Sequence, residues 1–216
     1  LCMNKIYVFS GLGVDKRVYD NIDFGTLDVE FIDWIEPLKN ESLENYALRI
    51  SEKITCDNPI LIGLSFGGML VAEISKIINV KKIILIASAK NKFELPFVFK
   101  LSGKLKLNQL LPYSILKSQN FILNWLFGIE SNEERQLLKS ILNDTNSMFL
   151  KWAINEIVNW KNEIYPENCF HIHGNQDRII PIKNVKADFV VKNGGHFMTV
   201  NKAKDIENII LNLIEK

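Results

Sequence analysis

Cysteine is scarce in this chain. Its 216 residues include only three cysteines, Cys2, Cys56 and Cys169, which are far apart and form no C-x-x-C pair. Neither a disulfide framework nor a zinc site is therefore predicted. Free cysteines of this kind are typical of a reducing compartment, and we expect a cytoplasmic protein.

An excess of charge of one sign is also missing. The chain has 26 Lys and Arg against 25 Asp and Glu, which leaves a net charge of +1. This balance argues against nucleic acid as a partner. No apolar run is long enough to span a membrane, and the short run Lys5–Phe9 is not a signal peptide. We expect one domain, no cofactor and no metal, because the length suits a single core and no corresponding motif occurs.

Six short runs are rich in β-branched and aromatic residues, which favour strands. Most of these runs are apolar throughout and do not alternate with polar residues. This pattern is typical of strands in a parallel sheet that helices cover on both faces. The predicted strands are Lys5–Phe9, Val29–Ile32, Ile60–Leu64, Lys82–Ala87, Cys169–His173 and Phe189–Val191.

Helical patterns separate several of these strands. Apolar residues recur at helical spacing over Leu43–Ile54, Gly67–Ile78 and Ala203–Ile214. Repeated alternation of strand and helix predicts a doubly wound α/β architecture.

The alternation stops between residues 90 and 166, where helical patterns occur without a strand pattern. We interpret 90–166 as a helical lid inserted into a core formed by residues 1–89 and 167–216. The predicted lid helices are Pro96–Lys106, Tyr113–Phe127, Glu133–Asn143 and Ser147–Trp160. The last of them carries an apolar stripe that we expect to pack on the core beneath it.

The strongest local motif is Gly63-Leu64-Ser65-Phe66-Gly67-Gly68, which lies between a predicted buried strand and a predicted helix. A serine at such a tight turn has a strained backbone, and small residues two positions before and after it prevent collisions. The turn also places Ser65 at a helix N-terminus, which favours negative charge during nucleophilic attack. We interpret Ser65 as a nucleophile. The alternative is a solvent-facing serine in a glycine-rich turn.

A serine nucleophile needs a base, and histidine suits this role because its ordinary pKa is about 6.5. The chain has three histidines. His171 and His173 lie two apart on one predicted strand, where structural histidines are expected. His196 lies in the glycine-rich loop Asn193–Met198 after the last strand, where a polar side chain can face a cleft. We expect His196 to be the general base.

The base in turn needs a carboxylate that orients it. Asp177 lies in the loop that leaves the fifth predicted strand, and it is the best candidate. The alternative is that Asp177 only caps backbone N–H groups of its turn. Asp188 begins the next strand instead of following one, and Glu94 already belongs to the predicted lid.

These blocks resemble the signatures of the α/β-hydrolase superfamily, including its carboxylesterases and the methyl esterases of biotin synthesis. The matching stretches are Gly63–Gly67, His173-Gly174-x-x-Asp177-x-x-Ile180-Pro181 and Gly195-His196, in the order Ser, Asp, His. The resemblance implies a sheet of order 2-1-3-4-5-6 with the site at the carboxyl ends of its strands. The N-terminal hairpin of larger members is missing.

The resemblance also implies an oxyanion hole formed by two backbone N–H groups. One belongs to Phe66, which follows the nucleophile, and the other to Leu12 in the loop after the first strand. Ser10 stands in that loop where relatives often have His. The change is in a side chain, so the backbone donors are expected to remain.

The implied reaction is hydrolysis of a carboxylic ester or thioester through an acyl-enzyme on Ser65. Aromatic residues of the predicted lid favour a small-molecule substrate with an apolar part. These residues are Phe93, Phe97, Phe99, Phe121, Trp125 and Phe127.

Other functions remain open at this point. An acyltransferase, or a lyase or C–C hydrolase, could use the same three residues, and a non-catalytic ligand-binding relative is the alternative that is not an enzyme. Dehalogenases and epoxide hydrolases of this fold need Asp at position 65 and are disfavoured.

Six lysines accompany one acid, Glu94, between residues 90 and 117. They predict a solvated face, or a docking surface for an acidic partner such as a phosphate-bearing acyl carrier. These are Lys90, Lys92, Lys100, Lys104, Lys106 and Lys117.

Overall fold

A six-stranded, all-parallel sheet forms the centre of the molecule. The computed structural model describes residues 5–106 and 120–215. Neighbouring strands follow the order β2-β1-β3-β4-β5-β6, which confirms the predicted topology. The strands are β1 (Ile6–Phe9), β2 (Val29–Ile32), β3 (Ile60–Leu64), β4 (Lys82–Ile86), β5 (Cys169–Gly174) and β6 (Phe189–Val191).

All six predicted strands are present, and their ends differ from the prediction by one residue at most. β4 stops at Ile86 because Ala87 has a φ of 46°, which no strand residue can have. β5 continues through Gly174 because this glycine still pairs with Val191 of β6.

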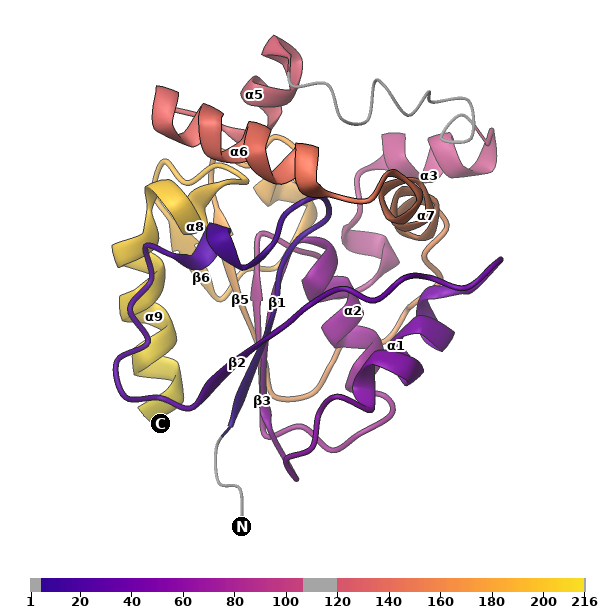
Figure 1. The fold of residues 1–216 in the computed structure, drawn as a ribbon, viewed down its shortest axis with the longest axis vertical. Coiled ribbons are helices and arrows are strands. Elements are labelled where there is room, and N and C mark those ends of the chain that lie inside the picture. The colour runs from indigo at the N-terminus through magenta and orange to yellow at the C-terminus, as the bar shows by residue number, and fades with distance from the viewer. Residues whose placement is uncertain (1–4, 107–119, 216) are drawn as a thin grey trace.

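Helices cover the two faces of the sheet (Figure 1). On one face lie α1 (Leu43–Ser51) and α2 (Phe66–Ile74). The other face is covered by the short η1 (Lys16–Tyr19), together with α8 (Met198–Asn201) and α9 (Ala203–Glu215).

Alternation along the strands divides the apolar residues between two cores. On β1, Ile6 and Val8 pack towards α9, whereas Tyr7 and Phe9 pack towards α1 and α2. The inner strands have apolar residues at nearly every position because both of their faces are buried.

Four predicted helices end earlier than expected, two of them by two residues, at Lys104 and Val158, and the two beside the sheet by three and four residues. α1 stops at Ser51 instead of Ile54, and α2 stops at Ile74 instead of Ile78. Serine lies at each end: the Ser51 hydroxyl donates to the Leu48 carbonyl at 2.7 Å, and Ser75 donates to Ala72 at 2.8 Å. Such local bonds compete with the helical pattern, and the chain continues in tighter turns.

Helices also connect β4 and β5, and they lie over the carboxyl end of the sheet (Figure 1). Residues 113–119 of the predicted helix Tyr113–Phe127 lie outside the described residues. No helix in the described ranges is long and apolar enough to cross a bilayer. The connecting elements are η2 (Lys92–Glu94), α3 (Phe97–Lys104), α5 (Phe121–Phe127), α6 (Asn132–Asp144) and α7 (Ser147–Val158); η4 (Ile182–Asn184) precedes β6.

The apolar stripe of α7 packs on the core, as predicted. Phe149, Ala153 and the following Trp160 are buried in the cluster beside α1 and α2. α6 contacts the other core through Leu138 and Ile141. Both sides of the sheet therefore contribute to the attachment of this helical segment.

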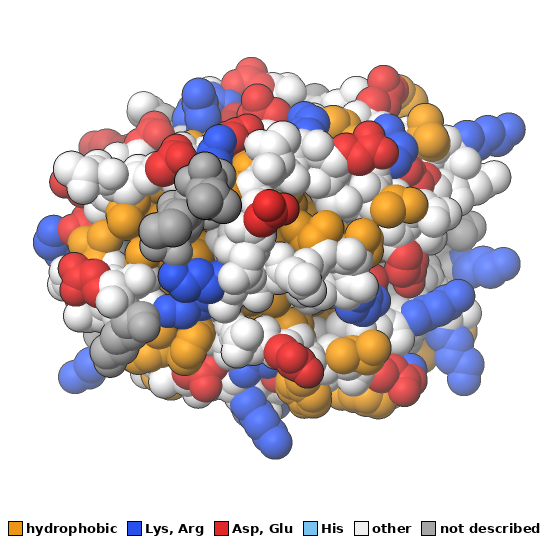
Figure 2. Space-filling model, turned by 90° about the horizontal axis from the view of Figure 1, so that it is seen from below, with side chains coloured by type: hydrophobic (Ala, Val, Ile, Leu, Met, Phe, Trp, Pro, Cys, Tyr) orange, Lys and Arg blue, Asp and Glu red, His pale blue; other side chains and the backbone are white. Residues whose placement is uncertain are grey.

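Figure 2 shows the surface at the end of the molecule opposite this helical segment. Acidic and basic side chains are mixed there, and hydrophobic ones form small groups (Figure 2). This face shows no extended patch of one charge, which agrees with the near-zero net charge of the sequence.

Gly67 occupies a place where the backbone of another segment leaves no room for a side chain. A Cβ at Gly67 would lie 2.3 Å from the Ser10 carbonyl oxygen and 2.7 Å from that of Phe9. We predict that Gly67→Ala lowers the free energy of unfolding by about 2–3 kcal/mol because main chain must move. Urea denaturation measures this loss.

Gly25→Ala is the matched control for this prediction. Gly25 is exposed with a φ of 59°, and nothing lies within 4 Å of an added Cβ. Only the left-handed backbone then opposes the substitution, at a cost of about 1 kcal/mol. Equal losses for the two variants would contradict the close approach at Gly67.

Candidate active site

Ser65 lies at a sharp turn between β3 and α2. Its φ of 51° and ψ of −117° lie outside the favoured regions for a side-chain-bearing residue. A Cβ at Gly63 would be only 2.5 Å from the Gly68 Cα, so the turn needs glycine on both sides of the serine. The nucleophile elbow predicted from the sequence therefore has the strained geometry expected of it.

Contacts from β4 hold this strained turn. The Ser65 N–H donates to the Ile86 carbonyl at 2.9 Å, and the Ser88 hydroxyl donates to the Ser65 carbonyl at 2.6 Å. Ser88 is fully buried. The supporting role of Ser88 was not predicted from the sequence, where the one signal for it is a hydroxyl residue shortly after an apolar strand.

His196 joins Ser65 to Asp177. Its Nε2 is 2.9 Å from the Ser65 Oγ, and its Nδ1 is 2.8 Å from the Asp177 Oδ2. A carboxylate can only accept, so Nδ1 carries the proton that is donated to Asp177. The unprotonated Nε2 then accepts from the serine hydroxyl, which is the arrangement that removes a proton from a nucleophile.

Asp177 both caps its own turn and holds the histidine. Its Oδ1 accepts from the N–H groups of Ile179 and Ile180, each at 2.9 Å, and its Oδ2 faces His196. Burial alone would raise the pKa of the Asp177 carboxyl. The electrostatic attraction and the hydrogen bond from His196, with help from His173 and the Ile180 N–H, outweigh burial and lower this pKa. Both carboxylate oxygens of Asp177 therefore accept hydrogen bonds, and the lowered pKa favours the ionised form.

The loops that carry Asp177 and His196 are in direct backbone contact. The Gln176 N–H donates to the Gly194 carbonyl at 2.9 Å. A Cβ at Gly174 would be 2.1 Å from that same carbonyl oxygen, so only glycine allows this approach. The contact explains why His196 and Asp177 meet although they lie on different loops.

His171 and His173 are buried behind this network and do not contact Ser65. The His173 Nε2 is 2.7 Å from the Ile180 carbonyl, so it must carry the proton, and its Nδ1 is 3.1 Å from the His171 Nε2. Burial lowers the pKa of both imidazoles, which keeps them neutral. The His173 Nε2 also lies 3.6 Å from the Asp177 Oδ2.

The two competing carboxylates serve as backbone caps elsewhere. Asp188 accepts from the His171 N–H at 2.8 Å. Glu94 accepts from the N–H groups of Lys90 at 2.7 Å and Lys186 at 3.2 Å. Neither is bonded to His196.

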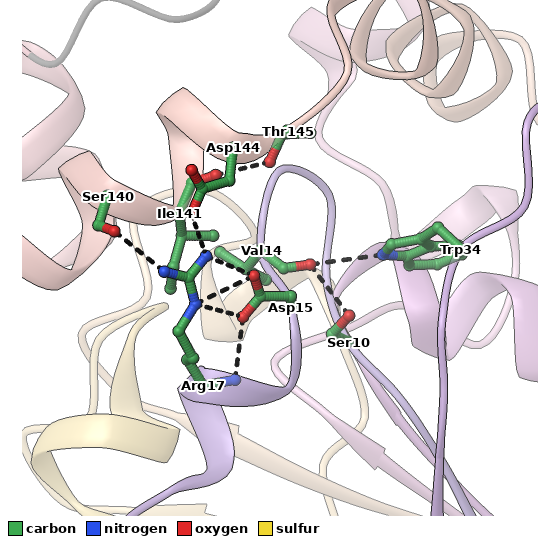
Figure 3. Close-up of polar contacts among 9 residues, drawn as sticks. All are labelled: Ser10, Val14, Asp15, Arg17, Trp34, Ser140, Ile141, Asp144 and Thr145. Carbon is green, nitrogen blue, oxygen red and sulfur yellow. Dashed lines mark hydrogen bonds and ion pairs between the residues drawn. The ribbon is translucent and has the colours of Figure 1, made fainter.

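Ser10 closes the loop that contains Leu12. Its hydroxyl donates to the Val14 carbonyl at 3.0 Å, and the indole of Trp34 donates to the same oxygen at 3.4 Å (Figure 3). Leu12 and Phe66 both line the cavity beside Ser65. Phe66 is the first residue of α2, so its N–H has no partner within the helix.

Arg17 connects the end of this loop to α6. Its guanidinium points from η1 towards α6 and lies between Asp15 at 2.6 Å and Asp144 at 2.7 Å (Figure 3). The hydrogen bond from Arg17 lowers the pKa of the Asp15 carboxyl. A Cβ at Gly13 would be 3.1 Å from Leu150 of α7, so the loop also packs closely under the helical segment.

An apolar cavity of about 660 Å³ opens beside Ser65 and His196. Helices α3, α5 and α7 and the loop after Asp177 form its walls. Of the six aromatic residues expected to shape the substrate site, Phe99 and Phe127 line the cavity. Phe93, Phe97, Phe121 and Trp125 have exposed fractions between 51% and 82%. The apolar residues that line the cavity include Leu95, Pro96, Val98, Phe99, Leu126, Phe127, Ile154, Ile157 and Ile180.

Arg178 also lines the cavity, directly after Asp177. Its Nη1 donates to the Trp125 carbonyl at 2.6 Å, and the guanidinium stacks on the indole at 4.7 Å. The loop that carries Asp177 is thereby bonded to α5.

The described lysines between residues 90 and 106 do not form one surface. Lys90 is buried and donates to the Lys186 carbonyl at 2.7 Å, and Lys92 pairs with Glu163. Lys117 lies outside the described residues. Lys100, Lys104 and Lys106 are exposed on or next to α3. In the described part of the chain, no group of three or more His, Cys, Asp or Glu side chains could hold a metal ion.

Asp177→Asn tests the role of the carboxylate. Asn keeps an oxygen for the N–H groups of the turn but offers no charge to His196. We predict that kcat for p-nitrophenyl acetate falls by about 10³–10⁴-fold, because the imidazole loses its tautomer and its counter-charge. A loss of less than tenfold would contradict the assignment.

The lowered pKa of Asp177 also predicts a pH dependence of stability. Because the pKa of the Asp177 carboxyl is lower in the folded chain than its ordinary value of about 3.9, the ionised carboxyl stabilises the fold at pH values above about 3.9. This stabilisation is lost as the pH falls through the lower pKa of the folded chain. The difference in Tm between wild type and Asp177→Asn should therefore shrink from pH 5 to pH 3. A constant difference would contradict the ionised native carboxyl.

Solved structures match almost the whole chain, whereas no protein-family model and no curated protein sequence matches it. An esterase from Exiguobacterium antarcticum has a TM-score of 0.70 at 16% identity, over 100% of this chain and 94% of that one. An α/β-hydrolase-fold protein from Burkholderia ambifaria gives 0.67 at 15%, over 97% and 90%.

A third match is a meta-cleavage product hydrolase from Pseudomonas fluorescens IP01, with a TM-score of 0.66 at 14% identity over 98% of this chain and 90% of that one. Structural matches at sequence identities this low show that the fold is shared, but they do not show that the reaction is the same. The sheet order, the serine turn between β3 and α2 and these matches together show that the chain has the α/β-hydrolase fold.

Proposed function

We propose that this protein is a serine hydrolase, a carboxylesterase, that cleaves an ester or thioester with an apolar part through an acyl-enzyme on Ser65. One observation carries the proposal: the His196 imidazole contacts the Ser65 Oγ at 2.9 Å and the Asp177 Oδ2 at 2.8 Å. The apolar cavity beside these atoms supports an apolar substrate.

In the first half of the reaction, the Ser65 oxygen attacks the ester carbonyl carbon while His196 Nε2 accepts the hydroxyl proton. The negative charge moves to the carbonyl oxygen, where the N–H groups of Leu12 and Phe66 stabilise it. Collapse of this intermediate breaks the bond to the leaving oxygen or sulfur. His196 gives that atom its proton, and an alcohol or thiol leaves.

In the second half, water attacks the acyl-enzyme while His196 again accepts a proton. The Ser65–acyl bond breaks, the serine regains its proton from His196, and a carboxylic acid is released. Asp177 stabilises the imidazolium in both halves without becoming protonated.

Two other reactions could use the same residues. C–C bond hydrolysis is the second candidate, because the fold and the three residues do not fix the reaction. An acyltransferase would pass the acyl group to an alcohol or thiol instead of water. Product analysis of esters and C–C substrates, with and without added acceptors, separates the three reactions. A non-catalytic ligand-binding role would leave every substrate unchanged.

A carrier-bound acyl group also remains a substrate prediction. The exposed Lys100, Lys104 and Lys106 are the described side chains that could contact such an acidic carrier.

The nucleophile is tested with a fluorophosphonate, which reacts with activated serines. We predict that the label maps to Ser65 and that Ser65→Ala abolishes labelling. Ser75→Ala is the matched control, since Ser75 lies at the other end of α2 and donates to Ala72. Labelling that persists in Ser65→Ala, or maps elsewhere, would contradict the proposal.

A further inference from the structure

Two cavities of very different size border the reacting atoms. The large apolar cavity has a volume of about 660 Å³. A second hollow of about 10 Å³ extends towards β1 and the His196 loop. Both are lined by Ser65, His196, Leu12 and Phe127. The small hollow offers about the room that one water molecule needs.

Phe127 is held at this boundary by its main chain. Its carbonyl accepts from the Phe197 N–H at 2.9 Å, so the last residue of α5 is bonded to the residue after His196. Gly128 follows with a φ of 71° and ends the helix, and the Asn201 amide donates to the Gly128 carbonyl at 3.2 Å.

Glycine contacts bring the two segments together. A Cβ at Gly195 would lie 3.2 Å from the Gly128 Cα and 3.3 Å from the Phe127 carbonyl oxygen. The backbone next to the catalytic histidine and the end of α5 are thus in van der Waals contact. The main chain at Phe127 cannot move away without breaking this contact and the hydrogen bond to Phe197.

Phe127 is the one aromatic side chain of the described residues that lines both the small hollow and the large cavity, apart from the imidazole of His196. It stands perpendicular to His196, with ring centroids 5.6 Å apart and an interplanar angle of 88°. On its other side it packs against Phe197 at 6.1 Å. Edge-to-face packing of this kind favours one orientation of the ring.

This arrangement has a consequence for an ester bound at Ser65. The acyl and alcohol arms leave the carbonyl carbon in diverging directions, so they cannot both follow the same wall of the large cavity. We propose that Phe127 determines specificity by limiting one arm to a small group, so that the substrate class is an ester with one long apolar arm and one short arm. This inference rests on the proposed function.

The test uses esters of matched composition. One series joins an octanoyl group to alcohols from methanol to octanol, and the mirrored series joins octanol to acyl groups from acetyl to octanoyl. For the wild type, we expect kcat/KM for the doubly long ester to be at least about tenfold below that of the better long–short ester.

Phe127→Ala should join the hollow to the large cavity and raise relative turnover of the doubly long ester by about tenfold. Phe99→Ala is the matched control, because Phe99 lines the large cavity but not the hollow. Phe99→Ala should change kcat/KM through its contact with the long arm of the ester. The doubly long ester should remain a poor substrate relative to the long–short ester.

Phe127→Leu provides a second, milder variant whose gain should lie between wild type and Phe127→Ala. Labelling of Ser65 by a small fluorophosphonate shows that the site is assembled in each variant. The inference would be overturned if the wild type cleaved the doubly long ester as fast as the long–short ester. It would also be overturned if the substitutions at Phe127 and Phe99 changed the relative kcat/KM of the doubly long ester equally. Failure of Ser65 to label, with no ester cleaved, would instead reject the proposed function.

Discussion

The backbone strain at Ser65 is the constraint on which the rest of the site depends. A residue with a φ of 51° and a ψ of −117° stays in place only where its surroundings fix it. Here the fixing contacts are the Ser65 N–H bond to Ile86 and the Ser88 hydroxyl bond to the Ser65 carbonyl. They come from β4, the strand next to β3, so the sheet itself holds the serine at its carboxyl edge. The strained turn is therefore held by fully buried residues of and next to β4, Ile86 and Ser88.

The helices between β4 and β5 belong to this construction as well. Arg17 and Gly13 join the loop of Leu12 to α6 and α7, and Phe127 joins α5 to the loop of His196. Arg178 adds a bond from the loop of Asp177 to Trp125. The loops that carry Leu12, Asp177 and His196 thus each have their own contact with the helical segment. The helices consequently shape the cavity and also restrain the loops around it.

Sequence patterns predicted the sheet well because both of its faces are buried, so that apolar runs and strands coincide over ranges such as Ile60–Leu64. They also indicated Ser65, Asp177 and His196, since each follows a strand in a turn with a recognisable composition. They indicated Phe127 only as one of six lid aromatics and did not indicate Ser88, because the contacts of both residues join segments far apart in the chain. Helix ends were missed where Ser51 and Ser75 bond to the preceding turn.

The central claim is that Ser65 forms an acyl-enzyme with the help of His196. Rapid mixing with p-nitrophenyl butyrate, followed by acid quench and mass analysis, tests it most directly. We predict a burst of about one p-nitrophenol molecule per enzyme molecule and a butyryl group on the peptide that contains Ser65. A burst that persists in Ser65→Ala, or a butyryl group on another residue, would contradict it.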